Sequence, residues 1–246
     1  MTERGMIFTG EMVRALLSGR KTQTRRIMKP QPEPCPRGGH WWPSNVFKTM
    51  LHIEEEMQNG KGGWGGLVGD ACPFGDVGDR IWVRETWGAV SHELDEDGRI
   101  QPWTPDRPAT VIHEMPFGNG YYSGHAIYAA DGDFTWGDDD GYEDGRSCWK
   151  PSIHMPRAAS RILLEITDVR VERLNAISEE DARAEGIIDG GCLNCGEPEP
   201  CGCANPEPDA SDAFAYLWQS IYGQENWNAN PWVWVIEFKR IEEQTA

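Results

Sequence analysis

The sequence has few of the features that place a protein in a membrane or outside the cell. It contains no uninterrupted apolar run of about 18 residues, the length that a membrane-spanning helix needs. The segment from Met1 to Lys21 has no continuous apolar stretch followed by a small-residue cleavage site, as a secretory signal would have. We therefore expect a cytoplasmic protein with no membrane partner.

Basic residues are also scarce. Lys and Arg number 23 against 40 Asp and Glu, which gives a formal net charge of −17. Strong sequence-independent binding to long nucleic acids needs many Lys and Arg to neutralise phosphates, so the composition weighs against it. Residues 1–30 are the exception, because basic residues there outnumber acidic ones. A basic patch on an acidic body indicates a small site for an anionic or electron-rich ligand.

Cysteine occurs in an odd number, seven. Four of the seven lie close together, at Cys192, Cys195, Cys201 and Cys203. In a reducing compartment such a cluster indicates metal binding or free thiols before disulfides. Four thiolates can surround one tetrahedral Zn²⁺ in a closed, structural site, and the metal would order a segment that has few apolar residues. The intervening glycines and prolines equally suit a flexible loop of reduced cysteines, and both interpretations stay open.

The periodicity of apolar residues predicts several strands and a few short helices. The expected helices end at Gly19, cover 52–57, run from Ser178 to Gly186, and begin at Ser211 or Asp212 with Phe214, Leu217, Trp218 and Ile221 on one face. The expected strands cover 79–87, 125–130, 160–171 and 231–239, with an extended segment or turn at 21–26. A one-residue slip in the alternation predicts a β-bulge near Thr167 or Asp168.

These elements predict an α+β fold: a small barrel of mostly antiparallel strands, flanking short helices and long insertions. We expect a single domain over 1–246. Its core is expected at about 5–30, 77–87, 125–130, 160–186 and 211–240, and its insertions at about 31–76, 88–158 and 187–210. The insertion at 31–76 is expected to be ordered but irregular, because it is rich in proline and glycine. The oligomeric state does not follow from the sequence.

The segment GRKTQTRR, residues 19–26, concentrates groups that can move protons. Lys21 has Arg20, Arg25 and Arg26 as neighbours, and like charges favour a neutral amine, as burial would. Such a lysine can take a proton from Thr24 or from water. The alternative is a solvated basic turn, because charge clusters usually lie on the surface.

Four segments in this order resemble the ASCH domain family of the PUA-like superfamily, and uncharacterised phage and prophage proteins of similar length. They are GRKTQTRR, VGDRIWVRETW at 77–87, ISEEDARAEG at 177–186 and NPWVWVIEFK at 230–239. The resemblance implies a PUA-like β-barrel with a ligand cleft, a fold used to recognise RNA or modified nucleosides.

The resemblance also implies an activity. Some small ASCH members are amidohydrolases that remove the acetyl group from N(4)-acetylcytidine with a Lys, a Thr and a Glu. These positions correspond to Lys21, Thr24 and Glu185, the last of which follows Ala182 by three residues. Thr24 or water would attack the acetyl carbonyl, Lys21 would accept the proton, and Glu185 would orient the lysine or protonate the leaving amine. No cofactor is needed for this reaction.

Six further residues are candidates for substrate binding: Arg20, Arg26, Arg84, Glu85, Trp87 and His154. Glu85 interrupts the apolar face of a strand, so it must be paired, with Arg26 or Arg84, or lie at a cleft. Trp87 can stack on a base, and His154 can act as an acid or base near neutral pH. The alternatives are a strand-end salt bridge, a core tryptophan and a structural histidine.

The expected partner is a modified nucleoside or a short RNA. Two other functions stay open: a module that binds RNA or a modified base without catalysis, and an acidic phage protein that mimics nucleic acid and captures a host protein. An enzyme loses turnover in Lys21→Ala, whereas a nucleic-acid binder shows salt-dependent affinity for oligonucleotides. An acidic mimic does neither, yet binds a basic host protein.

Metal analysis of protein purified without added zinc distinguishes the two interpretations of the cysteine cluster. A tetrathiolate site predicts about one zinc ion per chain and its loss in Cys192→Ser, whereas reduced cysteines predict less than about a tenth of an equivalent. Cys148→Ser is the control, because this cysteine lies outside the cluster. Zinc that survives Cys192→Ser would contradict the tetrathiolate site.

Overall fold

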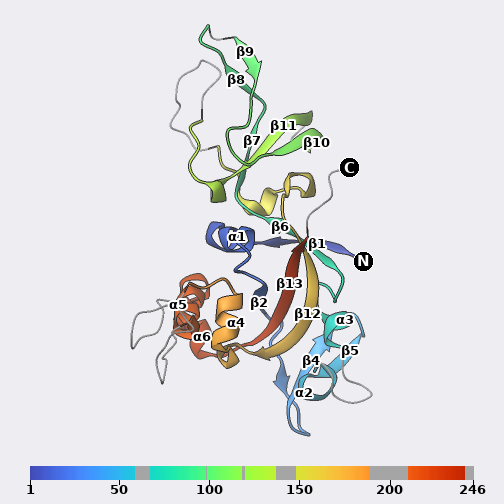
Figure 1. The fold of residues 1–246 in the computed structure, drawn as a ribbon. Helices are drawn as coiled ribbons and strands as arrows, with labels where there is room; N and C mark the ends of the chain where they lie inside the picture. Colours follow the sequence, from blue (N-terminus) through green and yellow to red (C-terminus); the bar gives the residue numbers. More distant parts are fainter. Residues whose placement is uncertain (59–66, 98, 118–119, 137–147, 189–209, 242–246) are drawn as a thin grey trace, which may run out of the picture. The chain divides into compact units, whose positions relative to one another are not determined.

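The structure is a computed structural model that describes residues 1–58, 67–97, 99–117, 120–136, 148–188 and 210–241 (Figure 1). The chain divides into two compact units. Unit 1 comprises Met1–Thr2, Ala15–Arg80 and Glu165–Arg240, and unit 2 comprises Glu3–Arg14, Ile81–Leu164 and Ile241–Ala246.

Most of the regular structure is β-sheet. The strands are β1 (Glu3–Ile7), β2 (Gln23–Ile27), β3 (Glu33–Pro34), β4 (His40–Ser44), β5 (Thr49–His52), β6 (Arg80–Arg84), β7 (Trp87–Val90), β8 (His92–Leu94), β9 (Ile100–Pro102), β10 (Thr110–Phe117), β11 (Gly120–Tyr128), β12 (Leu163–Arg173) and β13 (Trp232–Ile241). The helices are α1 (Gly10–Leu17), α2 (Ile53–Glu56), α3 (Val68–Ala71), α4 (Glu179–Ala184), α5 (Ala210–Tyr222) and α6 (Gln224–Asn228). Short 3₁₀ turns cover Ala129–Asp131, Ser152–His154, Arg157–Ala159 and Leu174–Ala176.

The expected α+β class is confirmed, but the described strands do not close into a barrel. The largest sheet has the strand order β1-β6-β12-β13-β2, so β1 and β2 stay at opposite edges. The other sheets have the orders β10-β11-β7, β3-β4-β5 and β8-β9. Residues of the expected insertions therefore pair mainly among themselves and do not extend the largest sheet.

In unit 1 the ends of α1 and α4 follow the sequence signals. α1 ends at Leu17, and Gly19 then adopts a left-handed φ of 76°, as the expected helix end requires. The Ser178 hydroxyl accepts a hydrogen bond from the Asp181 amide at 3.1 Å and so caps α4. Gly186 follows α4 with a φ of 90°. The expected helix from Ser178 to Gly186 is confirmed.

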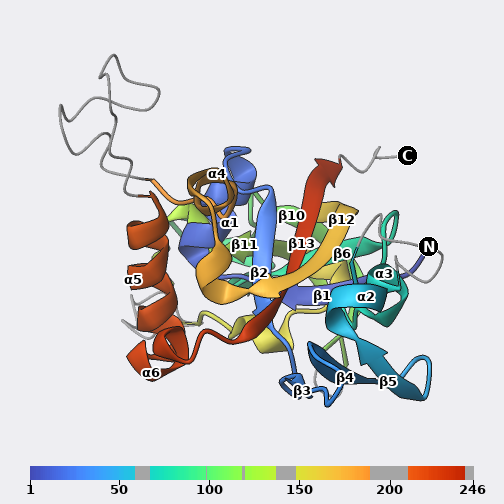
Figure 2. The ribbon, with the colours of Figure 1, turned by 90° about the horizontal axis from the view of Figure 1, so that it is seen from below.

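The start of α5 differs from the expectation. The helix begins at Ala210, and the Glu179 carboxylate accepts hydrogen bonds from the amides of Ala210 at 2.9 Å and Ser211 at 3.1 Å. An acid from α4 therefore binds the first two described amides of α5, and the helix begins before the expected cap at Ser211 or Asp212. α4, α5 and α6 lie together on one side of β2 (Figures 1 and 2).

The packing of α5 agrees only in part with the expected face. Phe214 and Trp218 are buried in one apolar cluster with Leu174, Ala182, Ala210, Val233 and Val235. Ile221, by contrast, remains 45% exposed, so the buried face ends before it. Along β12, Ile166 and Val169 are both buried, which is the slip in alternation that the sequence indicates.

The insertion at 31–76 is more regular than expected. β4 and β5 form an antiparallel pair in which Trp41 faces His52, and β3 adds a short third strand. Trp42 packs edge-on against Trp234 at 5.4 Å between ring centroids. Tryptophan suits a half-buried pleated surface, and this preference outweighed the proline and glycine content of the segment.

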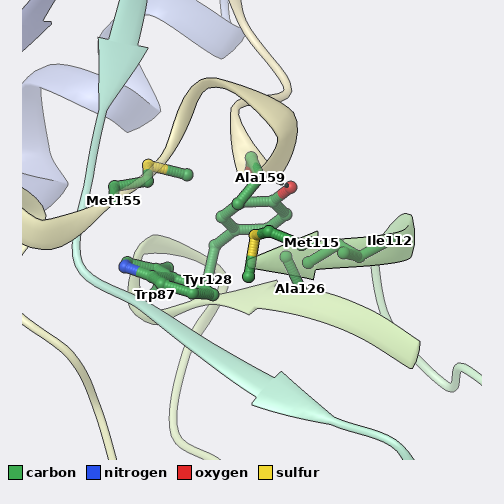
Figure 3. Packing of buried hydrophobic residues seen from close by; sticks show 7 residues of the cluster. All are labelled: Trp87, Ile112, Met115, Ala126, Tyr128, Met155 and Ala159. Atoms are coloured by element: carbon green, nitrogen blue, oxygen red, sulfur yellow. Dashed lines mark hydrogen bonds between the residues drawn. The ribbon is translucent and has the colours of Figure 1, made fainter. Parts of the chain in front are cut away.

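In unit 2, β10, β11 and β7 support an apolar cluster around Tyr128 (Figure 3). The cluster contains Trp87, Ile112, Met115, Ala126, Tyr128, Met155 and Ala159. The Tyr128 hydroxyl donates to the Ala159 carbonyl at 2.9 Å. The expected strand at 125–130 ends at Tyr128, where a 3₁₀ turn begins, and β7 to β10 were not expected.

Gly186 and Gly19 form a matched pair for a stability test, because both have positive φ. A Cβ at Gly186 would lie 2.8 Å from the Ala15 Cβ and 3.0 Å from the Lys21 Cβ, whereas a Cβ at Gly19 meets nothing within 4 Å. Both alanine variants carry the backbone cost of about 1–2 kcal/mol. Overpacking should make Gly186→Ala less stable than Gly19→Ala by a further about 1–3 kcal/mol in urea unfolding. Equal losses would contradict this packing.

Candidate functional site

The backbone brings Lys21 and Glu185 together in unit 1. The two residues form an isolated antiparallel β-bridge, although they are far apart in the sequence. The Thr22 amide donates to the Ala184 carbonyl at 2.8 Å, and the Phe238 amide donates to the Thr22 carbonyl at 2.9 Å. The segment before β2 is therefore held between the end of α4 and β13.

The side chains of Lys21 and Glu185 form a buried ion pair. Lys21 Nζ donates to Glu185 Oε2 at 2.6 Å and to the Glu185 backbone carbonyl at 2.8 Å. The Lys21 side chain is 0% exposed and that of Glu185 is 4% exposed. Burial lowers the pKa of Lys21 below its ordinary value, against the opposing attraction of Glu185. The site thus holds an amine that loses its proton more readily than a surface lysine.

Arg25 reaches the same carboxylate from β2. Its Nη1 lies 3.4 Å from Glu185 Oε1, and its Nη2 donates to Glu172 Oε1 at 2.5 Å and to Asp181 Oδ2 at 3.1 Å. Arg25 was expected to act only as a charge near Lys21 in the sequence. Its spacing of four residues from Lys21 in an extended segment was the available signal, because alternate residues of a strand share a face.

Thr24 lies next to Arg25 in β2, is buried, and faces Ile236 in the register with β13. Successive side chains of a strand point to opposite faces of the sheet. The Thr24 side chain is therefore directed away from the face on which Arg25 reaches Glu185. Of the three expected catalytic residues, Lys21 and Glu185 are in contact, whereas strand alternation directs Thr24 to the other face of β2.

An ion network extends from Arg25 toward solvent. Arg170 Nη2 donates to Asp181 Oδ1 at 2.8 Å, and Arg170 Nη1 also pairs with Glu237. Burial disfavours the charged form of Asp181, but the charges of Arg25 and Arg170 outweigh it and lower the pKa of this carboxyl. Asp181 is thus held as a carboxylate between two guanidinium groups.

Arg20 and Arg26, two candidates for substrate binding, also belong to unit 1. Arg20 is exposed, and its Nη1 donates to the Gly186 carbonyl at 3.0 Å. It is thus adjacent in sequence to Lys21 and bonded to the residue that follows Glu185. Arg26 is half-buried in β2 and faces Trp234 in the register with β13.

The other candidates, Arg84, Glu85, Trp87 and His154, lie in unit 2. The Arg84 guanidinium lies 5.3 Å from the Trp82 ring centroid and donates to the Ile153 carbonyl. Trp87 is only 1% exposed and packs in the Tyr128 cluster, so its ring offers no open face for stacking (Figure 3). His154 is exposed at the end of a 3₁₀ turn.

Glu85 directly follows β6 and is buried, as the alternation of the segment predicts, but its partner is neither Arg26 nor Arg84. Arg161 binds both carboxylate oxygens at 3.0 Å and also donates to Asp131 Oδ2 at 2.6 Å. Its guanidinium lies 3.8 Å from the Tyr128 ring centroid. Burial raises the pKa of Glu85, and the bonds from Arg161 oppose this shift. No local pattern indicated Arg161 or Asp131, because both are distant from Glu85 in the sequence.

In the part of the chain that the structure describes, no three or more His, Cys, Asp or Glu side chains are grouped so that they would hold a metal ion. Cys192, Cys195, Cys201 and Cys203 lie outside the described residues. No described helix has both the length and the apolar character needed to span a bilayer.

The lowered pKa of Lys21 predicts a pH-dependent stability. Between the folded pKa and the ordinary value of 10.5, the unfolded chain binds a proton that the folded chain lacks, so stability should rise with pH in this window. Lys21→Met should remove this rise, which has a limiting slope of about 1.4 kcal/mol per pH unit. Urea unfolding from pH 7 upward measures it, with the exposed Lys239→Met as control. Parallel curves for wild type and Lys21→Met would contradict the shift.

Comparison of the chain with protein-family models, curated proteins and solved structures finds no match. The resemblance to the ASCH family therefore rests on the four sequence segments, and the candidate site rests on the geometry of Lys21, Glu185 and Arg25.

Proposed function

We propose that the protein hydrolyses an amide bond on a modified nucleoside such as N(4)-acetylcytidine, with Lys21 and Glu185 as its proton-transfer pair. The observation that carries the proposal is the 2.6 Å contact between the Lys21 amine and the Glu185 carboxylate, both of them buried. A general base works best when its pKa lies near the working pH, and burial shifts Lys21 in that direction.

The reaction needs one nucleophile and two proton transfers. Neutral Lys21 takes a proton from water as the water oxygen bonds to the acetyl carbon. The tetrahedral intermediate then breaks its bond to the exocyclic nitrogen, which receives a proton from Lys21. Acetic acid and the free amine leave, and the acid gives its remaining proton to the solvent to become acetate. Glu185 holds the lysine in place throughout and stabilises its charged form. Water is the nucleophile in this scheme because Thr24 is directed to the other face of β2.

The choice of substrate rests on the resemblance. Lys21 and Thr24 stand in the GRKTQT context, and Glu185 ends a short helix three residues after Ala182, as in the N(4)-acetylcytidine amidohydrolases. The substrate must also be able to reach the Lys21 amine. Because the Lys21 side chain has no exposed surface, a substrate reaches it only when neighbouring side chains move. Arg20, which is exposed and bonded to the Gly186 carbonyl, is the candidate to move and to bind the substrate.

The full burial of the pair favours a second function, binding of RNA or a modified base without turnover. In that case Lys21 and Glu185 join β2 to α4 and do no chemistry. Amide hydrolysis and binding without turnover predict different results in one assay, which measures the release of cytidine.

The assay incubates purified protein with N(4)-acetylcytidine and follows cytidine release by chromatography. We expect Lys21→Ala to lose at least about 100-fold in kcat/KM, as removal of a general base does. Glu185→Gln should lose activity because the amide cannot stabilise the lysine charge. Lys239→Ala is the control, since Lys239 is exposed and pairs with Glu165.

Thr24→Ala identifies the nucleophile. Activity close to wild type supports attack by water, whereas complete loss in a folded variant assigns the attack to Thr24. Absence of cytidine release by the wild type would contradict the proposed reaction. Salt-dependent binding of oligonucleotides by the same sample would then support the binding module.

A further inference from the structure

We propose that Arg25 is the second counter-ion of Glu185 and holds this carboxylate in place when Lys21 gives up its proton. The effect of Arg25 on catalysis rests on the proposed function, whereas the effect of Arg25 on the titration of Lys21 does not. Arg25 would be a positioning residue, because it touches Glu185 and no reacting atom.

The two oxygens of Glu185 are shared between two cations. Oε2 accepts from Lys21 Nζ at 2.6 Å, and Oε1 lies 3.4 Å from Arg25 Nη1. The Arg25 side chain is 0% exposed, so water does not screen this contact. A buried carboxylate without a counter-ion is costly. If Lys21 were the sole partner of Glu185, this buried carboxylate would have no counter-ion whenever Lys21 lost its proton.

The position of Arg25 does not depend on Glu185. Glu172 and Asp181 hold its Nη2 at 2.5 and 3.1 Å, and the Phe214 ring centroid lies 5.8 Å from its guanidinium carbon. A guanidinium keeps its charge at every pH at which proteins fold. Arg25 therefore remains a fixed positive charge beside Glu185, whether Lys21 is charged or neutral.

Several charged groups act on Lys21, and they do not contribute equally. Glu185 favours the charged amine, whereas Arg25 and Arg26 on the same segment disfavour it. Glu172 and Asp181, from β12 and α4, face Arg25 and partly neutralise it. Arg170 pairs with both of these acids, at 3.5 and 2.8 Å, and has no contact with Glu185 among the described ion pairs. Arg25 is thus the cation that shares the carboxylate with Lys21.

The test follows the titration of Lys21 directly, by NMR of ¹³Cε in protein labelled at lysine, with Lys21→Met to assign the signal. Arg25→Gln and Arg25→Met remove the charge, and either suffices if the other does not fold. We expect the Lys21 midpoint to rise by about one pH unit in these variants, because a like charge leaves and Glu185 then relies on Lys21. Arg25→Lys keeps the charge and should stay close to wild type.

Arg170→Met is the matched control, because it removes a cation from the same network but not from Glu185. It should shift the midpoint less than Arg25→Gln. An unchanged midpoint in a folded Arg25→Gln protein would overturn the inference, as would an equal shift in Arg170→Met.

The effect of Arg25 on catalysis is measured separately from the NMR titration. If the wild type releases cytidine, the limb of the kcat/KM profile that reports the free base should move to higher pH in Arg25→Gln and return in Arg25→Lys. If no variant releases cytidine, the proposed reaction fails, and the NMR midpoints still decide whether Arg25 is the second counter-ion.

Discussion

The buried contact between Lys21 and Glu185 is the interaction on which unit 1 is organised. It joins the segment before β2 to the end of α4, and a backbone bridge between the same residues supports it. Its cost is desolvation of two charges, and geometry alone rarely offsets this cost. The structure adds a third charge, Arg25, whose own carboxylate partners are nearer the surface. The Lys21–Glu185 pair therefore belongs to an ion network. Arg25 contacts the buried Glu185 carboxylate, and carboxylates nearer the surface neutralise Arg25.

Unit 2 uses the same principle with different residues. Glu85 is buried directly after β6, and Arg161 binds both of its oxygens while it also pairs with Asp131. In both units an arginine makes the additional contacts, because a planar guanidinium presents several donors at fixed angles and a lysine does not. Both carboxylate oxygens of Glu85 accept hydrogen bonds from Arg161, which favours a structural role for this group. The Lys21 group contains an amine whose pKa is lowered by burial, which favours chemistry.

Local signals predicted local features well. Gly19 and Gly186 were expected to follow helices, and both have positive φ; Ser178 was expected to cap α4, and it does. The prediction that one face of β6 is apolar was also confirmed. The expected barrel, the irregular insertion at 31–76 and the cap of α5 were not, because each depends on which distant segments pair. The Glu179 carboxylate caps α5 from a separate helix, and no pattern within α5 encodes that contact.

For the candidate site, the sequence by itself determined the residue types and their local placement: a lysine in a basic segment after a helix, and a glutamate at the end of a short capped helix. Those features follow from backbone propensities and from neighbours a few residues away. Only the tertiary structure decided that Lys21 and Glu185 touch and that Arg25 shares the carboxylate. The reason is physical: burial and charge compensation depend on the packing of α4, β12 and β13 around β2, which is set by long-range contacts.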